Sequence, residues 1–298
     1  MSSERIAVVT ESVAVIPPGV QKELNIHVVP LTVEIDGVTY RDGVDLAPSD
    51  FYARLVQAKA TPHTSQPSPG AYLAVFAALA DAVDYILVLS LSGSVSGTYA
   101  SAVQAAAIFA EDARPGRKHP HVEVMDTRLA AVPQGLVAME AARAVKSGAP
   151  WKEVLRCARD VAARANMLVA IDTMEYLIRG GHVPKLAGLA ATALDLKPII
   201  QFHGGEPVPA GVARGFDHAC DVMVRRLEEE YARVASETGG TARLHVGVMH
   251  AGAPDRGERL LSLVRERLRP AESFLTDFTP VMGAHTGPGL AGIGYFVG

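Results

Sequence analysis

The chain has 298 residues, of which 49% are hydrophobic and 20% charged, and its formal net charge is −4. This length suffices for two domains with sizeable cores, and the composition argues against disorder. The slightly acidic balance argues against a general nucleic-acid binder, which would carry a basic face.

Neither a signal peptide nor a membrane span is apparent. The polar start leads directly into the apolar run Ile6–Val9, and no run approaches about 18 uninterrupted apolar residues. Cys157 and Cys220 lie far apart without CxxC spacing, so we expect buried free thiols. These features favour a cytoplasmic protein.

Apolar runs alternate with helical segments in the first half of the chain, which predicts a parallel sheet with right-handed crossovers. The predicted strands are Ile6–Thr10, Tyr85–Ser90 and Val122–Asp126. The predicted helices are Ser49–Gln57, capped by Ser49, then Gly70–Ala80, Gly97–Ala110, Leu129–Lys146 and Trp151–Arg164. Asp36-Gly37 favours a type I′ hairpin turn between His27–Ile35 and Val38–Arg41.

Beyond residue 165 hairpins are mixed with helices, which favours an antiparallel or mixed sheet with helices on one face. The predicted strands are Met167–Ile171, Lys197–Phe202, Val208–Ala213, Leu244–His250, Ser273–Thr279 and Ile293–Val297. The predicted helices are Met174–Arg179, closed by Gly180-Gly181, then Phe216–Ser236 and Asp255–Leu268. The sequence therefore predicts an α/β protein with a parallel-sheet domain at residues 1–165 and a second α/β domain at residues 166–298.

Two hydroxyl-rich loops, Thr64–Pro69 and Ser92–Thr98, each precede a predicted helix. Ser96 follows a strand, and its hydroxyl and the free N–H groups of Gly97 and Thr98 favour an anion at the helix start. The glycine also lets a ligand approach the backbone closely. A plain helix cap with flexible glycines is the alternative.

The other polar candidates are Thr64, Ser65 and His285. The two hydroxyls stand in a loop stiffened by prolines, where they can point into a cleft or cap the next helix. His285 lies in a glycine-rich stretch and can donate to a carboxylate or serve a structural role. Together these residues predict capture of a carboxylate or phosphate.

The sequence lacks the motifs of several common metal-binding, nucleotide-binding and hydrolase sites. The chain has no HExxH, no Walker-type loop and no GxSxG, and Gly211–Gly215 is too weak for a dinucleotide loop. We therefore expect no metal and no cofactor. The alternative to a binding protein is a hydrolase or phosphotransferase that uses Ser96 and His285.

Taken in order, the motifs of the chain resemble the DegV family over nearly its whole length. They are Thr10-Glu11-Ser12, Pro30-Leu31, Thr64–Ser68, Leu91–Ala102, Met125-Asp126-Thr127, Asp172–Leu177, Gly180-Gly181, Lys197–Ile200 and His285–Gly289. Each motif alone is weak, and their order makes the resemblance specific.

The resemblance implies two α/β domains with a long-chain fatty acid, such as palmitate, in a tunnel between them. It implies a carboxylate held by the hydroxyls of Thr64 and Ser96, with His285 close by. From their place in the same two loops, we add Ser65 and Gly97 to the predicted ligand-binding residues. In one branch of the family such a protein has no catalytic residues and presents the acid to a separate fatty acid kinase.

The chain departs from the family pattern in three places. Glu11-Ser12-Val13 stands where the family has Asp-Ser-Thr, and His182 stands where the family usually has an arginine. Of a basic cluster after the second hairpin only Arg214 is present, a possible contact to the kinase. Candidates for the tunnel wall are the apolar residues of Leu73–Leu79 and Leu186–Leu196.

Overall fold

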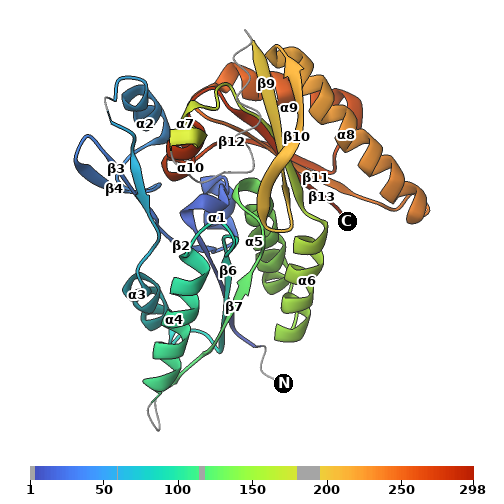
Figure 1. Cartoon of the computed structure of the whole chain (residues 1–298). Coiled ribbons are helices and arrows are strands. Elements are labelled where there is room, and N and C mark those ends of the chain that lie inside the picture. The colour runs from blue at the N-terminus through green and yellow to red at the C-terminus, as the bar shows by residue number, and fades with distance from the viewer. Residues whose placement is uncertain (1–3, 59, 114–117, 180–194) are drawn as a thin grey trace.

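The computed structural model describes residues 4–58, 60–113, 118–179 and 195–298 (Figure 1). Within them a parallel sheet of order β2-β1-β6-β7 consists of β1 (Ile6–Glu11), β2 (His27–Val29), β6 (Tyr85–Ser90) and β7 (His121–Asp126). A mixed sheet of order β10-β9-β8-β13-β11-β12 consists of β8 (Asn166–Ala170), β9 (Leu196–His203), β10 (Glu206–Arg214), β11 (Leu244–His250), β12 (Glu272–Asp277) and β13 (Ala291–Val297). A small sheet of order β4-β3-β5 consists of β3 (Thr32–Ile35), β4 (Val38–Arg41) and β5 (His63–Ser65).

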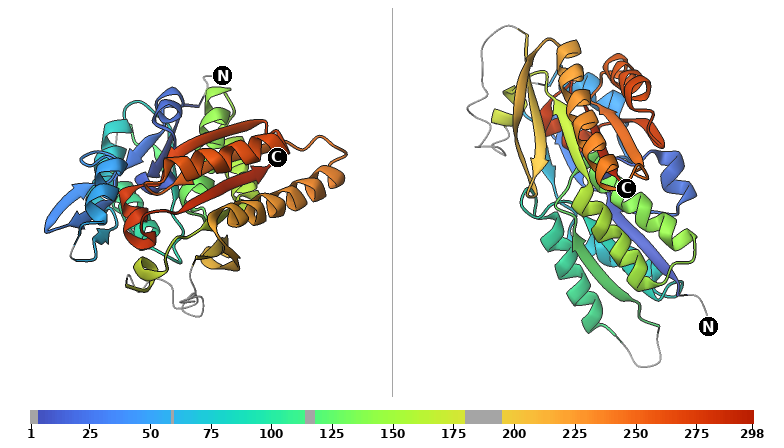
Figure 2. Two further views of the ribbon diagram at one scale, coloured as in Figure 1. Left: turned by 90° about the horizontal axis from the view of Figure 1, so that it is seen from above. Right: turned by 90° about the vertical axis from the view of Figure 1, so that its right-hand side faces the viewer.

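Helices cover these sheets. In chain order they are the 3-10 turn η1 (Ser12–Ala14), α1 (Pro18–Glu23), α2 (Pro48–Leu55), α3 (Pro69–Leu79), α4 (Thr98–Glu111), α5 (Ala131–Lys146), α6 (Trp151–Arg164), α7 (Glu175–Arg179), α8 (Phe216–Glu237), α9 (Pro254–Leu268) and α10 (Pro280–Thr286). In the right-hand view of Figure 2 the two large sheets lie toward opposite ends of an elongated molecule, with α5 and α6 at their junction.

The central strands of the parallel sheet, β1 and β6, are buried on both faces, as their apolar runs predict. In β1, Ala7 and Val9 belong to a core cluster with α3 and α4, whereas Val8 belongs to the cluster that contains α5. The predicted parallel sheet is therefore confirmed, with helices on either side.

The mixed sheet has two different faces, because successive side chains along a strand point in opposite directions. In β8, Leu168 and Ala170 pack with α8 and α9, whereas Met167 and Val169 belong to the opposite face. This arrangement confirms the predicted mixed sheet with its own helices on one face. The other face packs on α5 and, farther along, borders a cavity.

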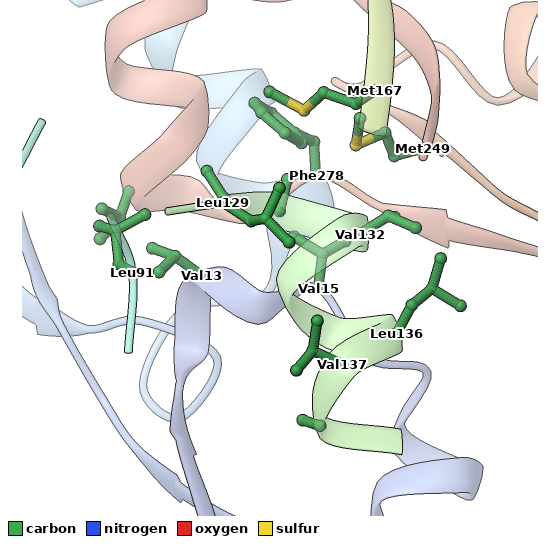
Figure 3. Close-up of a cluster of buried hydrophobic side chains, with 14 of the residues drawn as sticks. Val13, Val15, Leu91, Leu129, Val132, Leu136, Val137, Met167, Met249 and Phe278 are labelled. Atoms are coloured by element: carbon green, nitrogen blue, oxygen red, sulfur yellow. The ribbon is translucent and has the colours of Figure 1, made fainter. Parts of the chain in front are cut away.

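Helix α5 contacts both large sheets. Gly247 and Gly294 are cross-strand partners in β11 and β13, and a Cβ atom at either would lie 2.6 Å from Val132 Cγ1. Glycine at both positions therefore lets α5 approach the mixed sheet. Figure 3 shows Val132 in one cluster with Val15 and Met249, which come from different halves of the chain.

Residues 32–65 form a projecting unit, the arm, which contains β3, β4, α2 and β5. The predicted hairpin is confirmed, since Asp36 and Gly37 have φ values of 52° and 77° between paired strands. Strand β5 completes the sheet by pairing antiparallel with β3, where Thr64 lies opposite Val33.

Two local predictions are wrong. His27–Ile35 is not one strand, because Pro30 and Leu31 separate β2, which joins the parallel sheet, from β3 in the arm. Ser49 does not cap α2, since the helix begins at Pro48 and makes no side-chain cap bond. Proline has the right φ for a first helical position and lacks the N–H that would need a cap.

The change from parallel to mixed sheet falls between α6 and β8, close to the predicted boundary at residue 165. The division into domains there stays a prediction, because one hydrophobic cluster joins side chains such as Val8 and Val169 from both sides of it. Cys157 and Cys220 are free, the first partly and the second fully buried. Among the helices of the described residues, none combines the length and the apolar character needed to cross a bilayer.

Candidate functional site

A cavity of about 320 Å³ lies between the loops of the parallel-sheet half and the mixed sheet. Its apolar walls include Met167, Val169 and Ile171 of the β8 segment, Ile200 and Phe202 of β9, and Val281 and Met282 of α10. The polar lining consists of Thr64, Ser65, Gln66, Ser96, Gly97, His285 and Thr286. The volume is at the lower end of the roughly 300–1,000 Å³ of small-molecule sites.

The five residues predicted from the sequence to bind a ligand all line this one cavity. Thr64 and Ser65 lie on β5, and Thr64 Oγ1 is 2.8 Å from His285 Nε2. His285 lies in the last turn of α10, so the glycine-rich stretch around it is helical up to Thr286. The arm and the C-terminal helix thus meet at half-buried polar side chains.

Ser96 and Gly97 precede α4 on the opposite loop. Ser96 Oγ lies 2.8 Å from Thr98 Oγ1 and accepts the Thr98 N–H at 3.2 Å. The predicted Ser96 cap is not formed, because the N-cap residue of α4 is Gly97 and it makes no side-chain cap bond. The Ser96 hydroxyl accepts instead from the N–H of Thr98, the first residue of α4, so this N–H is not free for an anion. Within the described residues Ser96 bonds to Thr98 and not to His285, so the structure does not join them as nucleophile and base.

Gln66 is a cavity residue that the sequence reasoning missed. A Cβ atom on Gly97 would overlap the carboxamide of Gln66, so this side chain fills the space that the glycine leaves open. That a ligand approaches the backbone of Gly97 stays a prediction, since Gly97 lines the cavity but Gln66 lies where a side chain would be. The Ser101 hydroxyl of α4 donates to the Pro67 carbonyl at 2.6 Å and so joins this helix to the loop that carries Gln66.

The tip of the β9–β10 hairpin closes one side of the cavity. The Ser92 hydroxyl donates to the Gly205 carbonyl at 2.6 Å, and Arg128 Nη2 donates to the Gly204 carbonyl at 2.6 Å. Phe202 and the facing Pro207 line the cavity just behind this tip. The first half of the chain is thus bonded directly to the second half beside the site.

Glu11, where the chain departs from the family pattern, lies beneath the loop Ser92–Thr98, the serine loop. It is fully buried and accepts hydrogen bonds from the Tyr72 hydroxyl at 2.7 Å, the Leu91 N–H at 3.0 Å and Gln134 Nε2 at 2.7 Å. Burial raises the pKa of Glu11, which these donors only partly offset. Leu91 lines the cavity, so Glu11 supports the start of the loop that carries Ser96.

Other predicted residues lie away from the cavity. Arg214 is exposed at the end of β10. The apolar side chains of Leu73–Leu79 pack on the far face of the parallel sheet and not on the cavity, because α3 covers that face. Gly180-Gly181, His182 and most of Leu186–Leu196 lie outside the described residues.

One group of side chains in the described part of the chain has the spacing of a metal site. Its members, Glu140, His245 and Glu272, lie where α5 meets β11 and β12. The guanidinium of Arg143 already binds both carboxylates, and Glu272 also bonds to His245 Nδ1 at 3.1 Å. This group therefore works as an ion-pair network between the halves.

The cavity lining suits an amphiphile. Its hydroxyls, carboxamide and imidazole can hold a polar or anionic head group, and its long apolar walls can hold a hydrocarbon tail. The Thr64–His285 and Gln66–Gly97 contacts gather the polar groups, so head and tail would be separated.

The sequence matches the DegV family of uncharacterised proteins over residues 5–297. It is 30% identical to a DegV domain-containing protein of Halalkalibacterium halodurans, across 98% of this chain and 99% of that one. A fatty-acid-binding DegV family protein from Thermus thermophilus has the same fold, with a TM-score of 0.82, 29% identity and coverage of 98% and 99%. DegV of Bacillus subtilis, a fatty-acid-binding protein, superposes with a TM-score of 0.82 at 25% identity, covering 99% and 100%. The chain belongs to the DegV family.

Proposed function

We propose that the protein binds a long-chain fatty acid, with the carboxylate at Thr64, Ser96 and His285 and the tail along β8 and β9. The observation that carries this proposal is the joining of hydroxyl and imidazole groups to an otherwise apolar cavity. The fatty-acid-binding relatives from Thermus thermophilus and Bacillus subtilis support the ligand class. Ser65 and Gly97 complete the proposed head-group site.

The two ends of the ligand contribute differently to affinity. Each buried methylene contributes roughly 0.8 kcal/mol, so about ten of them contribute ~8 kcal/mol before ordering costs. A hydrogen bond between neutral groups contributes about 1 kcal/mol net. The tail therefore sets the affinity, and the head-group residues set the direction in which the ligand lies.

Native mass spectrometry of the purified protein tests the ligand class directly. We expect a bound mass in the range of C16–C18 acids, or uptake of added palmitate by ligand-free protein. Thr64→Ala combined with Ser96→Ala should weaken palmitate binding. Protein that is empty and also refuses palmitate would contradict the proposal.

We also propose that the protein is not an enzyme and presents its bound acid to a separate fatty acid kinase. This part rests on the family resemblance and on the exposed Arg214 at the end of β10. Acyl-phosphate formation is measured with a bacterial fatty acid kinase catalytic subunit, ATP and the loaded protein. Arg214→Ala should slow formation at least about threefold with palmitate affinity unchanged, as for a charge at the rim of an interface.

The same assay has a clear contrary outcome. No acyl phosphate with any kinase subunit would remove the presenting role and leave fatty-acid binding intact. Hydrolysis of generic esters or phosphoesters by the protein alone, abolished by Ser96→Ala, would favour an enzyme instead.

A further inference from the structure

Helix α10 lies along the arm and contacts it at three successive points. At its start the Asp42 carboxylate accepts the Val281 N–H at 3.4 Å. At its end His285 Nε2 meets Thr64 Oγ1 at 2.8 Å. Between these points the helix rests on Tyr52 of α2, and α10 contacts α2, β3 and β5 (Figure 1).

Tyr52 is the most constrained of these contacts. Its side chain is 4% exposed, and its hydroxyl donates to the Phe278 carbonyl at 2.9 Å, directly before α10. Burial raises the pKa of Tyr52 well above its ordinary value, so the hydroxyl stays a neutral donor.

The ring fits between two glycines of the second half. A Cβ atom on Gly283 would lie 2.5 Å from the Tyr52 hydroxyl oxygen, and one on Gly252 would lie 2.8 Å from Tyr52 Cβ. Two glycines at the surface of one buried aromatic ring leave little freedom for α10 to slide or rotate on the arm.

The geometry connects this contact to the cavity. Val281, Met282, His285 and Thr286 of α10 line the cavity, whereas Gly283 faces Tyr52. One face of α10, a helix of seven residues, therefore packs on the arm, while another face carries His285 into the cavity. A small rotation of α10 would move His285 away from Thr64, because both groups are held by different elements.

We propose that Tyr52 is a positioning residue of the head-group site. It sets α10 against the arm so that His285 and Thr64 face the same ligand atoms, without touching the ligand itself. The inference rests on the proposed fatty-acid binding and adds to it a residue that fixes head-group recognition from outside the cavity.

The test compares palmitate with methyl palmitate, which has the same tail and an esterified head. Tyr52→Phe removes the hydroxyl and keeps the ring between the glycines. We expect palmitate to bind about fivefold more weakly, because a displaced His285 would lose about one net hydrogen bond to the carboxylate. The affinity for methyl palmitate should stay unchanged. The imidazole resonances of His285 in NMR spectra should shift in the same variant.

Tyr295→Phe is the matched control. Tyr295 is 2% exposed in the core between α8 and the mixed sheet, and its hydroxyl donates to the partly buried Glu230 of α8. This variant removes the hydroxyl of another buried tyrosine, in a different core cluster from α10, so the ratio of acid to ester affinity and the His285 resonances should stay as in the wild type.

Gly283→Ala is a stronger perturbation, because its Cβ forces Tyr52 or α10 to move. It should lower palmitate affinity by more than about tenfold and ester affinity by less. Gly19→Ala in α1, where a Cβ has nothing within 4 Å, is its control. If Gly283→Ala fails to fold, Tyr52→Phe still decides.

The outcomes separate the two proposals. A wild-type protein that binds acid and ester equally would remove the head-group assignment itself. A wild-type preference for the acid that Tyr52→Phe leaves unchanged, or an equal loss for acid and ester, would overturn the positioning role alone.

Discussion

The two halves of the molecule contribute different chemistry to the same cavity. The parallel-sheet half supplies most polar groups, such as Thr64 and Ser96, from the arm and from a loop after a strand. The mixed-sheet half supplies a flat apolar face, with Val169 and Ile200 side by side on paired strands. Loops can aim hydroxyls at a point, whereas a sheet face presents an extended surface.

The two halves also differ in the acidic side chains that contact α5. Glu11 of β1 is surrounded by neutral donors, including Gln134, and burial raises its pKa. Glu272 of β12 is ion-paired with Arg143, and its pKa is lowered to about 2. The glutamate of the parallel-sheet half is therefore held by neutral hydrogen-bond donors beside the cavity, and the glutamate of the mixed-sheet half is held by an ion pair away from it.

The largest expected effect is on the apolar wall. Val169→Phe would place extra ring carbons in the cavity and displace about three or four methylenes, which corresponds to roughly 100-fold weaker palmitate binding. The measurement is a titration with acids of decreasing length. The loss should shrink for shorter acids, and an equal loss at every length would show that the wall does not hold the tail.

The next effect concerns the polar end. Thr64→Val keeps the shape of a branched side chain in β5 and removes the hydroxyl that meets His285. We expect about five- to tenfold weaker palmitate binding by calorimetry, since one or two hydrogen bonds are lost. Binding of the corresponding fatty alcohol should change less, and a larger loss for the alcohol would contradict the assignment.

A smaller effect on stability is expected at the ion-pair network. Glu272→Gln removes the charge bonded to Arg143 and His245, which should lower the free energy of unfolding by about 1–2 kcal/mol at pH 7. Because the folded pKa of about 2 lies below the unfolded value, this stabilisation is complete above about pH 4.5 and is lost as the pH falls toward 2.

Urea unfolding of wild type and variant at several pH values measures this difference. The two proteins should converge toward pH 2–3 while palmitate affinity stays equal. A difference that persists at low pH would rule out the charge as its cause.

The smallest expected effect is a gain in stability, at Asp42. Asp42 is 1% exposed, and burial raises its pKa, so its ionised form costs stability that is regained as the pH falls below the folded pKa. Asp42→Asn keeps an acceptor for the Val281 N–H. We expect the variant to be up to about 1 kcal/mol more stable at pH 7 and equal to wild type below about pH 4. Thermal unfolding across this range tests it, and a variant less stable at pH 7 would show that the charge itself is needed.

Much of the fold is readable from the sequence. Tyr85–Ser90 is a strand with the predicted bounds, because a run of six residues that is almost wholly apolar is too short for a buried helix and favours a buried strand. The Asp36-Gly37 turn is equally local, since both residues accept positive φ. The five ligand-lining candidates were identified from loop chemistry and the resemblance, and all line one cavity.

Other features depend on partners distant in the chain. The role of Gly97 could not be read locally, because the space beside it is filled by Gln66 from another loop. Gly247 and Gly294 carry no chemical signal, yet they let α5 pack on the mixed sheet. Tyr52 looks like any buried aromatic residue until α10 is placed against it.

The sequence by itself determined the α/β class, most elements, the polar candidates and the family, since these depend on local periodicity, turn chemistry and ordered motifs. Only the tertiary structure decided which groups meet: Thr64 with His285, Ser92 with Gly205, and Tyr52 with the start of α10. Each of these pairs joins residues more than a hundred positions apart, and such contacts are fixed by the packing of whole elements and not by neighbours in the chain.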